Sequence, residues 1–160
     1  MKKCIFLLVL LFQGILVFAQ TDKEDLAMVQ ASFGKDKKQI VQQYMQFSPA
    51  DSVKFWPVYD QFEKERQALG VERYGIIENY AKQYATLNDD QATKLAQSTF
   101  ANDGKYNDLY KNYFPKFAKA VGGLTSAKFF QLESYIQNTI RLGIQEEIPF
   151  IGELKTTKKM

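Results

Sequence analysis

Apolar residues recur every three or four positions along most of this chain, and no segment shows the strict alternation of a strand. This spacing predicts four helical segments. They extend from about Asp25 to Phe47, from Ser48 to about Leu87, from Asn88 to about Val121 and from Thr125 to about Glu147. Helices joined by short connections pack antiparallel. We therefore expect an all-α fold, a long, kinked, antiparallel helical hairpin-type domain of four helices.

Capping residues mark the starts of the last three segments. Ser48 precedes Pro49 at the first helical position, and Asp51 lies near the positive end of the helix dipole. Asn88 precedes two acidic residues, and Thr125 precedes the last apolar stripe. The sequence therefore predicts N-caps at these three polar residues.

Helix-breaking residues occur inside the two central segments. Pro57 in the second and Pro115 in the third each remove one intrahelical hydrogen bond, so we expect a kink at each. Asn102-Asp103-Gly104 is locally typical of a turn, but the apolar spacing keeps its phase across these residues. We favour one continuous third helix, and a turn at Gly104 is the alternative.

The first residues of the chain are typical of an export signal. Lys2 and Lys3 precede an apolar run from Ile5 to Phe18, and Ala19 closes it with a small residue. A transmembrane anchor is the alternative, but a spanning helix needs roughly 20 apolar residues, and a polar stretch follows this run. We expect residues 1–19 to be a signal peptide that is cleaved after Ala19.

Such a cleavage has chemical consequences for the remaining chain. It removes Cys4, the only cysteine, and the chain has no histidine. Disulfide bonds are then excluded, and zinc and soft metals lose their usual ligands. We expect residues 20–152 to form a single helical domain that is stabilised by packing, and residues 153–160 to form a disordered basic tail.

The charge balance and the acidic pairs give no sign of nucleic-acid binding or catalysis. Removing Lys2 and Lys3 from the 21 basic residues leaves 19 against 18 acidic ones, without the clustered positive charge that phosphates require. The pairs Asp89/Asp90, Glu63/Glu65 and Glu146/Glu147 could hold calcium, but no loop has EF-hand spacing, so helix caps and solvated faces are favoured. No acid, serine or lysine stands in a recognisable catalytic signature. We expect no enzyme activity, no metal, no small-molecule cofactor and no nucleic-acid partner.

Three helix starts share one pattern, an apolar residue before a capping residue and then polar positions. They are Phe47-Ser48-Pro49-Ala50-Asp51, Leu87-Asn88-Asp89-Asp90-Gln91 and Leu124-Thr125-Ser126-Ala127-Lys128. A helical protein with a signal peptide and such elements resembles the Spy/CpxP family of periplasmic stress proteins, named for its Leu-Thr-x-x-Gln repeats. Only the second start has glutamine in the fifth place, with asparagine in place of threonine. The run Phe55-Trp56-Pro57-Val58-Tyr59 is similar to the sequences of a branch of the family that is found in exported bacterial proteins.

The resemblance implies a periplasmic location and a bent helical hairpin that often dimerises into a cradle. It also implies either an ATP-independent chaperone or a stress or metal sensor that binds a membrane partner. We therefore expect a periplasmic, chaperone-like binding protein whose partners are unfolded clients or other proteins, with a homodimer as its assembly. A regulator that binds the extracytoplasmic domain of a membrane sensor, and a non-catalytic structural adaptor, are the alternatives.

Aromatic residues make up 14% of the chain, more than two facing helical stripes can bury. Some rings are therefore expected to line an exposed concave face, where neighbouring lysines and arginines would hold acidic clients. Core packing is the alternative for each ring. For Trp56, the best single candidate, the alternative is an anchor between the first and second helices. The predicted client- or partner-binding residues are Phe55, Trp56, Tyr59, Phe62, Tyr110, Tyr113, Phe129 and Phe130.

Overall fold

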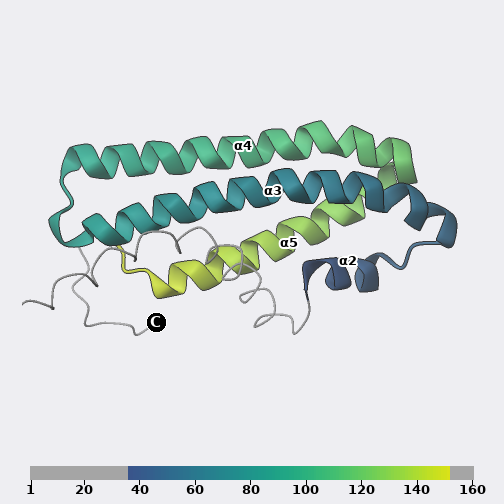
Figure 1. Cartoon of the computed structure of the whole chain (residues 1–160), viewed down its shortest axis with the longest axis horizontal. Coiled ribbons are helices and arrows are strands. Elements are labelled where there is room, and N and C mark those ends of the chain that lie inside the picture. Colours follow the sequence, from purple (N-terminus) through teal and green to yellow (C-terminus); the bar gives the residue numbers. More distant parts are fainter. Residues whose placement is uncertain (1–35, 152–160) are drawn as a thin grey trace, which may run out of the picture.

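The computed structural model describes residues 36–151, which form a bundle of long helices (Figure 1). The helices are α2 (Lys37–Met45), α3 (Pro49–Gln83), α4 (Asp89–Val121) and α5 (Gly123–Glu147), with a short 3-10 helix η1 (Tyr84–Thr86) after α3. No strand occurs in this range, and the predicted all-α class is confirmed. None of these helices is both long and apolar enough to cross a membrane.

Several predictions about the ends of the chain lie outside the described residues. These are the signal peptide (1–19), the basic tail (153–160) and the first part of the helix expected from Asp25. What is described of that helix is α2, which ends at Met45 because Gln46 adopts a left-handed conformation with φ 49°. The described residues therefore include most, but not all, of the predicted domain 20–152.

Two of the three predicted N-caps are confirmed. Ser48 Oγ accepts a hydrogen bond from the Asp51 amide at 3.1 Å, and Asn88 forms a capping box with Gln91. The cap predicted at Thr125 is wrong, because α5 already begins at Gly123. Gly122 alone separates α4 from α5, and its φ of 87° turns the chain within one residue.

Neither proline ends its helix. Pro57 lies inside α3 and Pro115 inside α4, and both helices continue past them. The preference for one continuous third helix is also confirmed, since α4 passes through Asn102-Asp103-Gly104 without a break. The polar residues of that segment have a tertiary role, which is described with the site.

The long helices pack side by side. In Figure 1, α3 and α4 run antiparallel along their whole length, and α5 returns from the far end of α4 at an angle beneath α3. The short α2 lies alongside the first half of α5. In the described part of the chain, the Cα atoms of α3 stay more than 8 Å from those of α5 and α2. Side chains therefore fill the space between these helices.

The core has two parts. The first, called the aromatic cluster, lies where all four helices meet, and the second, called the isoleucine cluster, lies along α5 with one residue from α2. The buried members of the aromatic cluster are Val41, Met45, Phe55, Tyr59, Phe62, Leu109, Tyr113, Phe117 and Phe129. The isoleucine cluster consists of Ile40, Ile136, Ile140 and Ile144. Because α2 contributes to both clusters, the short helix is part of the core and not an appendage.

Candidate functional site

The aromatic residues predicted to form an exposed concave face lie in or against the core. Five of the eight are buried, namely Phe55, Tyr59, Phe62, Tyr113 and Phe129, and the other three, Trp56, Tyr110 and Phe130, are partly buried and pack against the aromatic cluster. The expectation of an open face is therefore corrected for this structure. That expectation assumed that only two facing helical stripes bury the rings, whereas residues from α2, α3, α4 and α5 all contribute to the aromatic cluster.

The rings of the aromatic cluster are in direct contact across three helices. The centroid of Phe129 on α5 lies 4.7 Å from that of Phe117 on α4 and 5.2 Å from that of Phe55 on α3. Phe62 completes the group at 5.6 Å from Phe129, with its ring nearly perpendicular. Aromatic pairs in such tilted and edge-to-face arrangements stabilise a core beyond the area that they bury.

Trp56 has the structure of an anchor, which was the alternative for this residue. Its ring packs edge-on against Phe55 and Tyr59 at 5.2 Å, and its Nε1 donates a hydrogen bond to Ser52 Oγ at 2.9 Å. The ammonium group of Lys38 on α2 lies 5.1 Å from the indole centroid. Trp56 thus links α2 to α3 through a cation–π contact and remains only partly exposed.

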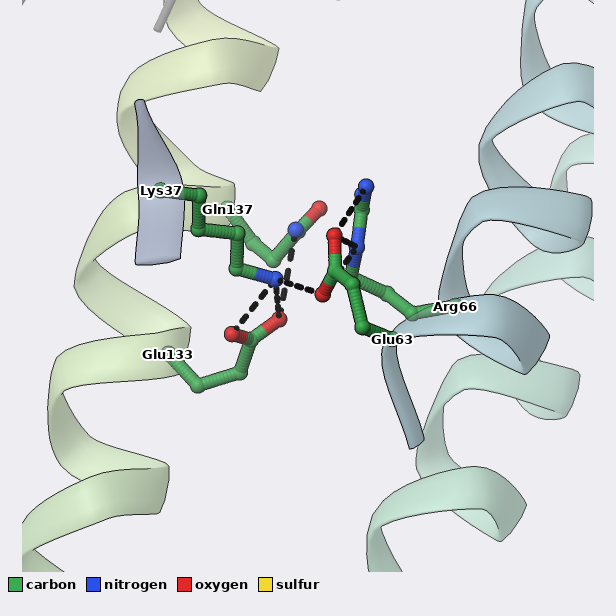
Figure 2. Close-up of polar contacts among 5 residues, drawn as sticks. All are labelled: Lys37, Glu63, Arg66, Glu133 and Gln137. Carbon is green, nitrogen blue, oxygen red and sulfur yellow. Dashed lines mark hydrogen bonds and ion pairs between the residues drawn. The ribbon is translucent and has the colours of Figure 1, made fainter. Parts of the chain in front are cut away.

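A buried group of polar residues lies between α2, α3 and α5 (Figure 2). Lys37, the first residue of α2, directs its Nζ between the two longer helices, 2.7 Å from Glu63 Oε2 and 3.0 Å from Glu133 Oε1. Arg66 binds Glu63 through Nε at 3.0 Å and through its terminal nitrogen at 2.9 Å. Gln137 donates to Glu133 Oε1 at 3.3 Å. We call these five residues the buried ion cluster.

The charges of the buried ion cluster balance. Two carboxylates face one ammonium and one guanidinium group, as buried charges require if they are to stay ionised. Burial opposes the ionisation of Glu63, but the attraction of Lys37 and Arg66 outweighs it and holds the pKa of Glu63 below its ordinary value. Burial also raises the pKa of Tyr59, and the neighbouring carboxylates of Glu63 and Glu133 raise it further.

The buried ion cluster is not predicted by the sequence pattern. The expectation that Glu63 lies on a solvated face is wrong, because its side chain is only 15% exposed. A signal was present in the last helix, where Glu133 stands within the apolar stripe, four residues after Phe129 and three before Ile136. A carboxylate on the apolar face of a helix is expected to have a buried cationic partner. The partner, Lys37, cannot be identified from spacing because it lies 96 residues away.

A second polar group ties the three long helices together further along the bundle. Asn102 on α4 is fully buried, accepts a hydrogen bond from Arg73 Nε at 2.9 Å and donates to the Leu69 carbonyl at 3.1 Å. Asp103 forms ion pairs with Arg73 on α3 and with Arg141 on α5, the latter at 3.0 Å. The segment that is locally typical of a turn is therefore polar because it bonds to neighbouring helices.

The other acidic pairs lie where sequence analysis placed them. Asp89 and Asp90 are in the first turn of α4, and Glu146 and Glu147 are exposed at the end of α5. Between residues 36 and 151, no group of three or more carboxylate, histidine or cysteine side chains is arranged to hold a metal ion.

The site that emerges is the surface on which α2 rests. It has an apolar part, with Phe55 and Tyr59 on α3 and Phe129 and Ile136 on α5, and a charged part, with Glu63 and Glu133. We call these six residues the α2 groove.

The α2 helix fits this groove through one face. Lys37, Ile40, Val41 and Met45 are buried, whereas the residues between them are exposed. At the end of α2, Lys128 on α5 donates a hydrogen bond to the Tyr44 carbonyl at 2.8 Å. The arrangement is that of an amphipathic helix with its apolar face packed on the neighbouring helices and an ion pair at its first residue.

Comparison with known proteins does not assign the chain to a family. The resemblance to the Spy/CpxP family stays a prediction from the sequence. No family model, no curated protein and no solved structure matches the chain.

Proposed function

We propose that the protein is an exported, chaperone-like binding protein that holds apolar segments of other proteins on the α2 groove, without ATP. One observation carries the proposal: α2 covers one side of the aromatic cluster. This helix has only nine residues and is joined to α3 by the short connection Gln46–Ser48.

A helix of this length can detach from the bundle while the other helices stay packed together. Isolated helices shorter than about 12 residues are marginal in water, so α2 depends on the groove for its structure. Local opening of one part of a fold requires less free energy than unfolding of the whole. Opening of α2 would uncover Phe55, Tyr59 and Phe129 as one continuous apolar surface. Large exposed apolar surfaces are typical of protein-binding sites.

The predicted signal peptide and the family resemblance support the same function. Together they imply an exported helical protein that protects unfolded clients. Four of the eight aromatic residues predicted from the sequence retain a role in this proposal, because they line or border the α2 groove. These are Phe55, Trp56, Tyr59 and Phe129.

Two variants of Gln42 test the proposal. This residue is exposed in the middle of α2, so Gln42→Gly weakens the helix by about 1 kcal/mol relative to Gln42→Ala without removing a buried contact. Gln42→Gly should uncover the groove about fivefold more often. We expect this variant to suppress the light scattering of an aggregating client at lower concentration than Gln42→Ala, and to bind more of a hydrophobic dye. Equal protection by both variants, or none by either at excess protein, would refute the proposed function.

A further inference from the structure

The charged part of the α2 groove has consequences for what can replace α2. Glu133 is fully buried, and within the described residues its charge is matched by Lys37, with Gln137 as a neutral neighbour. Glu63 retains Arg66 when α2 leaves. Without Lys37, the buried ion cluster therefore retains two carboxylates and one guanidinium group, an excess of one negative charge.

The second oxygen of Glu133 shows how strongly this site depends on a cation. Glu133 Oε2 is buried, and Lys37 Nζ lies 2.8 Å from it as its ion-pair partner. A buried carboxylate is costly unless a charge is paired with it. An apolar segment without a cation would cover Glu133 and leave it unpaired, and an acidic segment would add repulsion.

The apolar part of the groove sets the spacing of the remaining contacts. On α2, the buried aliphatic residues follow Lys37 at the third, fourth and eighth positions, as Ile40, Val41 and Met45. This is the repeat of one face of a helix. A segment that replaces α2 with the same contacts must be helical and must carry its cation at one end of an aliphatic stripe.

We infer that the α2 groove is a docking site for a basic amphipathic helix of a partner protein, with a lysine or arginine followed by aliphatic residues at the third, fourth and eighth positions. The α2 helix occupies this site in the free protein as an internal competitor. The inference rests on the proposed function and specifies its partner. It also replaces the expectation of acidic clients, because the groove itself is acidic.

The test uses peptides with the sequence of residues 36–46, which contain α2 and its caps, as probes for the purified protein. One peptide keeps Lys37 and a matched peptide carries Lys37→Gln. We expect the lysine peptide to bind Gln42→Gly about fivefold more tightly than Gln42→Ala, because the affinity scales with the fraction of open groove. We expect the glutamine peptide to bind at least tenfold more weakly, since it leaves Glu133 unpaired. Equal affinity of the two peptides, or of the two variants for the lysine peptide, would overturn the inference.

A second test changes the protein in place of the peptide, at Glu133. Glu133→Gln should remove most of the preference for the lysine peptide, with folding verified by circular dichroism. If this variant does not fold, the two peptides on Gln42→Gly still decide the question. A preference for lysine that persists in folded Glu133→Gln would place the peptide elsewhere and overturn the inference.

Sedimentation of Gln42→Gly separates a second copy of the chain from a foreign partner. We expect this variant to bind the lysine peptide without a change in its assembly state. A dimer that excludes the peptide would show that the occupant is α2 of another copy, and the inference would be wrong. If Gln42→Gly protects clients better than Gln42→Ala while the peptides bind equally, the proposed function stands and only the charge selectivity fails.

Discussion

The ammonium nitrogen of Lys37 lies 2.8 Å from the buried carboxylate of Glu133, which is 96 residues further along the chain. This contact joins the first turn of α2 to the middle of α5. It places a charge pair beside the aromatic cluster, with the Lys37 ammonium group 5.7 Å from the centroid of Phe62. In a buried pair of this kind, desolvation offsets much of the attraction, but loss of one partner leaves an uncompensated buried charge. Lys37 and Glu133 therefore fix how α2 sits in its groove.

Two neighbouring lysines test this contact. Lys37→Ala leaves Glu133 buried without its cation, so we expect it to cost about 3 kcal/mol of unfolding free energy or to undock α2. Lys38→Ala breaks an exposed ion pair with Asp60 and the cation–π contact with Trp56, and should cost about 1 kcal/mol. Urea unfolding followed by circular dichroism measures both. Equal costs for the two variants would contradict the assignment of Lys37 to the core.

Acid should weaken the same region. The pKa of Glu63 is lowered from an ordinary value of 4.5, so its stabilising effect is complete above about pH 4.5 and is lost as the pH falls through the lower pKa of the folded state. Glu63→Gln removes this ionisation. We expect its unfolding free energy to fall less than that of the wild type between neutral pH and about pH 3. An unchanged acid dependence in Glu63→Gln would show that other carboxylates are responsible.

The aromatic cluster should be the most sensitive part of the core. Phe129→Ala removes a fully buried ring that contacts α3 and α4, and we expect a loss of about 3 to 5 kcal/mol. Phe100→Ala is the matched control, because the Phe100 side chain is 71% exposed, and its effect should stay within about 0.5 kcal/mol. Thermal and urea unfolding of both variants measure the difference. A small loss for Phe129→Ala would mean that the ring has another environment in solution.

Helices and their starts could be predicted from this sequence because the responsible interactions are local. Ser48 and Asn88 cap helices through hydrogen bonds to residues three positions away. The apolar spacing across Asn102 correctly outweighed the turn-like residues there. Local rules failed at Thr125, because Gly122, with its positive φ, starts α5 earlier than a side-chain cap would.

The candidate site could not be predicted because it depends on distant pairs. Which rings of an aromatic stripe are buried is decided by how many helices surround them, and that number is a property of the tertiary fold. Glu133 stood out in the apolar stripe of its helix, but Lys37 was one member of a lysine-rich segment. Their pairing follows only from the docking of α2 against α5.

Adjacent glycines at the junction of α4 and α5 provide a further test. Gly122 has a φ of 87°, so Gly122→Ala should cost about 1 kcal/mol or more from backbone strain, although an added Cβ meets no atom within 4 Å. Gly123 is the first residue of α5, and Gly123→Ala should be neutral or stabilising by up to about 1 kcal/mol. A lower melting temperature for Gly122→Ala and an unchanged or higher one for Gly123→Ala would confirm the one-residue junction. The same sign for both would contradict it.

The central claim is that α2 leaves its groove while the bundle stays folded. Native-state hydrogen exchange of backbone amides tests this most directly, with Ile40 reporting on α2 and Phe62 on α3. We expect the Ile40 amide to exchange through a local opening of lower free energy than that of Phe62, and Gln42→Gly to accelerate Ile40 about fivefold relative to Gln42→Ala without changing Phe62. Exchange of both amides with the same free energy, equal to that of global unfolding, would show that α2 opens only with the whole bundle and would contradict the claim.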